Sequence, residues 1–161
     1  MIRNYTSNVP ASRSVQYITE KLAARGASKV QQLFDNNKRI YGIMFELDVM
    51  PDRPMTFRLP AKIDGAYEIL KNRLRRPTTA AKQKCREQAE RTAWRLISDW
   101  VDVQLSMIEL DQAQMAEIFM PYIYNHHTGE TLYEHVERGD FQHLLLLQQK
   151  KRNGSIPSTA Y

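Results

Sequence analysis

The longest regular pattern of apolar and polar residues runs from Thr79 to Leu110. Its apolar residues recur at steps close to three and four, which places side chains along one stripe of a helix. They are Cys85, Ala89, Ala93, Leu96, Ile97, Trp100, Leu105 and Ile108. No Gly or Pro interrupts the segment. The preceding Pro77 and a cap at Thr78 or Thr79 mark its start, because a threonine side chain can accept hydrogen bonds from the first free amides. We therefore predict a long central helix over 79–110, with Trp100 on the stripe and Trp94 at its edge.

A second pattern, between residues 30 and 59, has the period of strands. Apolar and polar residues alternate in 40–49 and 55–59, as in strands with one buried face, and 30–34 gives a weaker strand signal. The buried face is predicted to carry Tyr41, Ile43, Phe45, Leu47, Met55, Phe57 and Leu59. The connections are too short for parallel crossovers, so an antiparallel meander is predicted.

Helices are predicted on both sides of this meander in the sequence. Apolar residues at helical spacing indicate a first helix over 12–25, ended by Gly26, and a second from Ile63 to just before Pro77. These elements give the α+β class: a three-stranded antiparallel meander packed on helices, with a long central helix and a helical C-terminal half.

The C-terminal half shows two sequence matches to the capping box that opens helices. Asp111 with Gln114 is predicted to open a short helix through Met120, and Thr131 with Glu134 to open a final one. The segment 122–129 between them is predicted to be a loop. Gly139 is expected to interrupt the final helix before a last helical stretch over 141–147.

The length of 161 residues and the apolar content of 42% fit one domain with one core. We predict a single domain over 1–149, composed of a helix–meander–helix part (12–76) and a helical part (79–147). Residues 150–161 are rich in Gly, Ser and Pro for their length and poor in apolar residues, so a disordered tail is predicted there.

The charge of the chain is unevenly distributed. Residues 1–95 hold 19 Lys and Arg against 9 Asp and Glu, whereas residues 96–137 hold 8 acids and no Lys or Arg. The residues from Arg138 onward hold 4 basic residues and 1 acid, so the net charge of the whole chain is +5. Two interpretations remain open: solvated helix faces that differ in sign, or a basic part that contacts a polyanion and an acidic part that contacts something else.

The basic residues are densest around Pro77, at the end of the second helix and on the first half of the central one. A polyanion laid across this hinge could contact several cations, and phosphate contacts of this kind favour binding without sequence preference. We therefore predict nucleic-acid binding. The residues predicted to carry it are Arg73, Arg75, Arg76, Lys82, Lys84, Arg86, Arg91 and Arg95.

A protein-interaction module is the alternative prediction. The acidic, apolar-rich span 96–137 could contact a second copy of the chain, as in a virion or scaffold component, or a host defence protein. The residues predicted for such a partner or oligomer interface are Trp94, Asp99, Asp102, Tyr122 and Tyr124.

Catalytic and metal-binding patterns are weak throughout the sequence. Asp99 and Asp102 share a helix face, but paired carboxylates are common on helix surfaces. His126 and His127 are adjacent in the predicted loop, and His135 lies in a different element. No cysteine joins them, so no metal is predicted. No phosphate-binding glycine loop or nucleophile motif is present, and we expect no enzyme activity and no cofactor.

The expected location is an intracellular, reducing compartment. The single cysteine has no partner for an intramolecular disulfide, the N-terminal residues form no apolar signal, and no run of about 18 apolar residues occurs, so no membrane partner is expected.

Four stretches of the sequence carry a family resemblance: YTSNVPASRSVQYITEKL, FRLPAKIDGAYEILK, QAERTAWRLISDWVDVQL, and FMPY followed by GETLYEHV. The set resembles small uncharacterised proteins encoded by bacteriophages and related mobile elements. The resemblance covers most of residues 5–137. It implies a phage context, and hence the host cytoplasm, but no assigned activity.

Overall fold

The computed structural model describes residues 3–152, and its side chains are described as far as residue 148. The described part is an α+β fold with a three-stranded sheet and a long central helix, as the sequence predicts. Its elements are α1 (Ala11–Ala24), β1 (Ser28–Phe34), β2 (Ile40–Met50), β3 (Arg53–Pro60), α2 (Ile63–Lys71), α3 (Thr79–Glu109), α4 (Met115–Phe119), a 3₁₀ turn (Met120–Tyr122), β4 (Tyr124–Asn125), β5 (Glu130–Thr131), α5 (Leu132–Arg138) and α6 (Gln142–Arg152).

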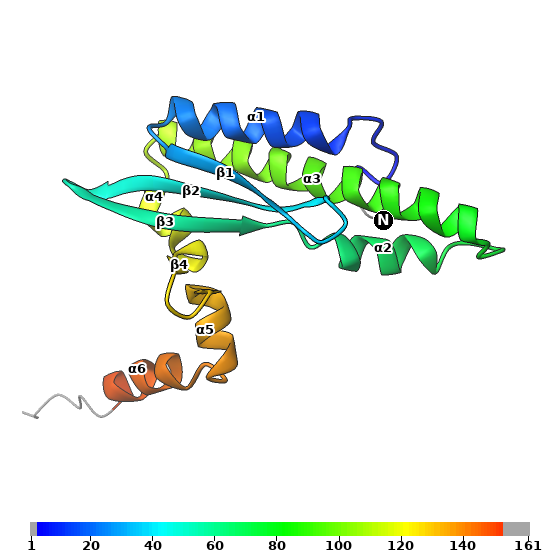
Figure 1. The fold of residues 1–161 in the computed structure, drawn as a ribbon. Helices are drawn as coiled ribbons and strands as arrows, with labels where there is room; N and C mark the ends of the chain where they lie inside the picture. Colours follow the sequence, from blue (N-terminus) through cyan, green and yellow to red (C-terminus); the bar gives the residue numbers. More distant parts are fainter. Residues whose placement is uncertain (1–2, 153–161) are drawn as a thin grey trace, which may run out of the picture.

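The three strands form an antiparallel meander in the order β1-β2-β3, which confirms the predicted topology. Helices α1 and α3 lie side by side over one face of this sheet, and α2 lies alongside the first half of α3, beyond the sheet (Figure 1). The core fills the space between the sheet and the helices. Its fully buried members include Val15, Ile18, Leu22, Ile43, Phe45, Phe57, Trp94, Val101 and Phe119.

Helix α3 begins and ends close to the predicted residues. The Thr78 hydroxyl accepts a hydrogen bond from the Ala81 amide at 3.2 Å, so the cap is Thr78, one of the two threonines that the sequence suggested. The helix runs without a break to Glu109 because no residue within it breaks the backbone hydrogen-bond ladder. It therefore serves as the common support for α1, α2 and the sheet (Figure 1).

Three aromatic residues are buried differently from the prediction. Trp94, expected at the edge of the stripe, has no exposed surface, whereas Trp100 is half-buried. Tyr41, expected on the buried face of β2, has 41% of its surface exposed, while Ile43, Phe45 and Leu47 are buried as expected. Periodicity gives the side of an element on which a residue lies, but it does not say where along that side the packed neighbours end.

Two helix ends also differ from the prediction. Helix α2 ends at Lys71, although apolar spacing predicted continuation toward Pro77. Pro77 itself disfavours helical backbone only at Arg76, the residue before it. Helix α4 is capped by a box formed by Gln114 and Glu117, and the predicted pair of Asp111 and Gln114 is wrong. Asp111 has a φ of 55° in the turn that follows α3, which is outside the helical region.

The predicted loop over 122–129 contains a short hairpin, because β4 pairs with β5. The second capping box is confirmed: the Thr131 hydroxyl accepts from the Glu134 amide, and the Thr131 amide donates to the Glu134 carboxylate at 2.7 Å. Gly139 ends α5 as expected.

The last helix, α6, extends to Arg152, beyond the predicted start of the tail at residue 150. Residues 153–161 of that predicted tail lie outside the described part. Among the described helices, none combines the length and the apolar character that a membrane crossing requires.

Candidate nucleic-acid interface

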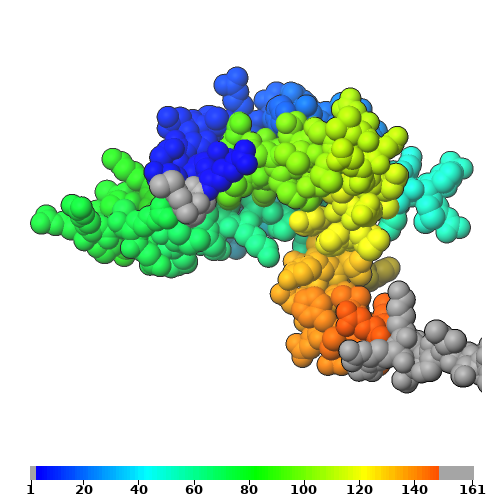
Figure 2. Space-filling view, turned by 180° about the vertical axis from the view of Figure 1, so that it is seen from behind, coloured from blue at the N-terminus to red at the C-terminus, as the bar shows by residue number. Residues whose placement is uncertain are grey.

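Five of the eight predicted nucleic-acid contacts gather where α2 gives way to α3. We call them the basic tip: they are Arg73, Arg75, Arg76, Lys82 and Lys84. All five are exposed, and the junction that carries them forms one end of the molecule, opposite the turn between β2 and β3 (Figure 1). Figure 2, seen from behind, shows the same junction projecting at the left.

The cations of the basic tip have no acidic partner among the described residues. The nearby acids are engaged by other groups: Glu68 pairs with Lys71 at 2.7 Å, and Glu87 accepts a hydrogen bond from Gln83. Arg73 places its guanidinium 5.7 Å from the centre of the Tyr5 ring. The tip therefore presents positive charge that no carboxylate of the described chain offsets.

The other three predicted contacts, Arg86, Arg91 and Arg95, are occupied within the chain. Arg86 forms an ion pair with Asp64 and stacks over the Tyr67 ring, with 4.7 Å between guanidinium carbon and ring centre. Arg91 donates to the Gln88 side chain at 2.6 Å, and Arg95 lies 3.1 Å from Asp99. These cations are thus weaker candidates for phosphate contacts than those of the tip.

The helical geometry also divides the predicted patch. At about 100° per residue, Lys82 and Arg86 project toward one side of α3, and Lys84, Arg91 and Arg95 toward roughly the opposite side. One face of the helix therefore does not present all of them. The basic tip contains Lys82 from one side of α3 and Lys84 from the other, beside the three arginines of the junction.

Two acids predicted for a partner interface hold the N-terminal part of the chain against α3. Asp99 accepts a hydrogen bond from Asn4 at 2.9 Å and pairs with Arg95. Asp102 accepts from the Tyr17 hydroxyl at 2.7 Å and lies 3.2 Å from Lys21. Hydrogen bonds from Tyr17 and Lys21 lower the pKa of Asp102. Both acids therefore have cationic or hydrogen-bonding neighbours within the chain.

The prediction that Trp94 lies at a partner interface is wrong. Its side chain has no exposed surface, and its indole nitrogen donates to the Ile40 carbonyl at 3.0 Å, because this position of α3 faces the sheet. The half-buried Tyr122 packs edge-on against Trp100, and burial raises its pKa. Tyr124 packs under the guanidinium of Arg58, 4.9 Å from the ring centre.

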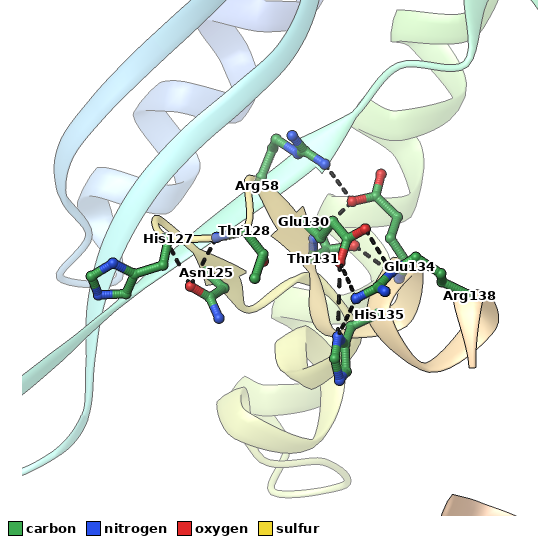
Figure 3. A network of polar contacts seen from close by, with 9 residues as sticks. All are labelled: Arg58, Asn125, His127, Thr128, Glu130, Thr131, Glu134, His135 and Arg138. Atoms are coloured by element: carbon green, nitrogen blue, oxygen red, sulfur yellow. Dashed lines mark hydrogen bonds and ion pairs between the residues drawn. The ribbon is translucent and has the colours of Figure 1, made fainter. Parts of the chain in front are cut away.

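A network of polar contacts attaches the β4–β5 hairpin and α5 to strand β3 (Figure 3). Arg58 of β3 donates to the Glu134 carboxylate at 2.5 Å and to the Gly129 carbonyl at 3.2 Å. Glu130 pairs with Arg138 at 3.0 Å and lies 3.8 Å from the His135 ring nitrogen. Arg58, which alternates along β3 with the buried Phe57 and Leu59, thus holds the C-terminal part against the sheet.

The histidines considered as metal ligands make separate contacts. His126 lies 3.0 Å from the Thr56 hydroxyl, whereas the contact of His127 is its backbone amide, which donates to Asn125 (Figure 3). Within residues 3–148, no group of three or more His, Cys, Asp or Glu side chains could hold a metal ion.

A groove between α2, α3 and α5 was not predicted from the sequence. It has a volume of about 740 Å³ and a mostly apolar lining. The lining residues are Pro60, Lys62, Ala66, Ile69, Ala93, Leu96, Ile97, Pro121, Tyr122, Thr131, Tyr133, Glu134 and Glu137. Ile69 is 48% exposed, and an exposed large apolar side chain of this kind marks the groove on α2.

Comparison of the chain with protein-family models, with curated proteins and with solved structures gives no match.

Proposed function

We propose that this chain is a phage-encoded, non-enzymatic accessory protein that binds nucleic acid in the host cytoplasm through its basic tip. The observation that supports the proposal is the group of five exposed cations without an acidic partner in the described part of the chain. Each such cation can neutralise a phosphate and release counterions, which favours binding.

The chemistry of the tip supports binding with little sequence preference. Arg and Lys side chains on a projecting junction reach the phosphate backbone, whereas base recognition needs side chains placed on base edges or exposed rings for stacking. Tyr5, the aromatic residue next to the tip, lies beneath Arg73 and is half-buried. Phosphate contact is therefore the main interaction that we assign to the tip.

The alternative, a protein-interaction module that uses the acidic span 96–137, has weaker support. Asp99 and Asp102 form contacts within the chain, and Trp94 is inside the core. An interface that used these acids would have to compete with Arg95, Tyr17 and Lys21 for them.

The proposal is tested by titrating the protein with single- and double-stranded oligonucleotides of mixed sequence at several salt concentrations. The logarithm of the affinity should fall linearly with the logarithm of salt, by about 0.9 per phosphate neutralised on a duplex and about 0.7 on a single strand. Replacing Arg75 and Arg76 together by Ala should reduce the duplex slope by about 1.8.

The matched control is Arg53→Ala compared with Arg75→Ala, because each removes one exposed cation. Arg53 is the first residue of β3, and the turn between β2 and β3 is at the opposite end of the molecule from the basic tip (Figure 1). Arg53→Ala should leave the slope almost unchanged. Absence of binding at low salt would overturn the proposal, and equal effects of the two single changes would remove the assignment to the basic tip.

A further inference from the structure

Helix α6 carries a run of four leucines that the rest of the described chain leaves exposed. Leu144, Leu145, Leu146 and Leu147 have 47%, 47%, 55% and 66% of their surface exposed. At about 100° per residue, four consecutive positions extend about 300° around a helix. A helix that is apolar around most of its circumference is typical of a buried one, so these leucines need a concave partner rather than a flat one.

The connection between α5 and α6 has a defined geometry. The amides of Asp140 and Phe141 donate to the carbonyls of Glu137 and Val136, both at 3.0 Å. Asp140 and Phe141 have φ values of 50° and 58°, a region that non-glycine residues adopt only when the surroundings hold them there. The Phe141 ring packs against Tyr133 with 6.4 Å between centres. The direction in which α6 leaves α5 is thus set by several contacts.

This geometry separates α6 from the groove of its own chain. The groove lies between α5 and α2, and α6 extends from α5 on the side away from α2 (Figures 1 and 2). Each chain therefore carries an apolar helix and an apolar groove that it does not bring together. The groove has a floor of Ala93, Leu96 and Ile97 from α3 and a wall formed by Ala66 and Ile69 of α2.

We propose that α6 of one copy docks into the groove of a second copy, and that the reverse contact forms at the same time. The contact would bury the leucines of α6 against the apolar lining of the groove, with complementary charge at the rim. The groove rim carries Glu134 and Glu137 beside Lys62, whereas the α6 sequence, residues 142–152, contains three Lys and Arg and no acid. The contact is isologous because each chain supplies one helix and one groove, so the two contacts close a dimer.

The dimer interface is separate from the basic tip, because no tip residue lines the groove. A dimer would present two tips, and two linked phosphate-binding surfaces bind one polyanion more tightly than either alone. The dimer itself does not depend on nucleic-acid binding, so either proposal can fail without the other.

The first test is the mass of the full chain in solution, measured by light scattering over a range of concentrations. The expected mass is twice that of one 18.8 kDa chain. Ile69→Glu in the groove and the double change Leu145→Glu with Leu146→Glu in α6 should each give a monomer. The control Val103→Glu should remain a dimer, because Val103 is 57% exposed on α3 and does not line the groove.

The second test distinguishes docking in the groove from pairing of α6 with α6. Chains with Ile69→Cys are mixed with chains with Leu145→Cys or Leu146→Cys under oxidation, and a disulfide-linked dimer is expected only in the mixture. Circular dichroism of each variant should match the parent chain, since all replaced residues are exposed. A monomeric parent chain overturns the proposal, and so does a dimer that survives Ile69→Glu but not the α6 change.

Discussion

The indole nitrogen of Trp94 donates a hydrogen bond to the carbonyl oxygen of Ile40 at 3.0 Å, within the core. Trp94 is the largest of the fully buried side chains, and Ile40 is the first residue of β2. The bond therefore joins the middle of the longest helix to the central strand of the sheet. It also explains why a residue at the edge of the predicted stripe is buried, since an indole needs a partner for its N–H when it leaves water.

Replacing Trp94 by Phe should lower the free energy of unfolding by about 2 to 4 kcal/mol, because it removes a hydrogen bond and leaves a cavity. Urea denaturation followed by circular dichroism measures the loss. Trp100→Phe is the control, because Trp100 is half-buried and should cost less. Equal losses for the two changes would contradict the role assigned to the Trp94 bond.

Glu134 should give the chain a measurable acid dependence. Burial opposes its ionisation, but the hydrogen bond from the Thr131 amide and the charge of Arg58 together hold the pKa of its carboxyl below the usual 4.5. A lowered pKa contributes stability above the unfolded pKa, and this contribution disappears as pH falls through the folded pKa. The stability difference between the parent chain and Glu134→Gln should therefore be largest above about pH 4.5 and shrink below it.

Urea titrations at a series of pH values measure this difference. Glu137→Gln is a suitable control, because Glu137 is exposed and accepts its hydrogen bond from the Tyr133 hydroxyl rather than from an arginine. A difference for Glu134→Gln that stays constant as pH falls would show that its charge does not stabilise the attachment of α5.

Gly42 should not tolerate a side chain. A Cβ at this position would lie 3.3 Å from the Leu59 carbonyl oxygen and 3.4 Å from Leu33 Cδ1, and the backbone oxygen has little freedom to move. Gly42→Val should destabilise the sheet by about 1 to 3 kcal/mol through overpacking. Gly65→Ala provides the contrast.

The Gly65 position in α2 has no atom within 4 Å of an added Cβ. Alanine there should be neutral or stabilise the chain by about 0.4 to 1 kcal/mol, because glycine is a poor helix former. The melting temperature should fall for Gly42→Val and should rise or stay unchanged for Gly65→Ala. A larger fall for Gly65→Ala than for Gly42→Val would contradict the packing described for Gly42.

The division of the predicted basic patch can be tested by comparing two double changes of equal charge. Arg91→Ala with Arg95→Ala should reduce the salt slope of duplex binding by clearly less than the value of about 1.8 expected for Arg75→Ala with Arg76→Ala. The physical reason is that Arg91 and Arg95 already contact Gln88 and Asp99. Equal reductions would mean that the polyanion lies along α3 rather than across the tip.

Elements whose signals are local could be predicted from the sequence. Helix α3 follows from the absence of breakers between Thr79 and Glu109, and the cap of α5 follows from Thr131 and Glu134, which interact across one turn. The meander follows from alternation and short turns. For the site, the sequence located a concentration of cations around Pro77, because charge density along the chain is visible without a fold.

The partners of these residues, in contrast, depend on the tertiary structure. Whether Arg86 faces solvent or Asp64, and whether Trp94 faces a partner or Ile40, depends on which distant segments pack against α3. The groove behind Ile69 likewise exists only because α2, α3 and α5 converge from three parts of the chain. Local patterns fix the direction of a side chain from its own helix, whereas its burial and its partner depend on contacts between residues far apart in sequence.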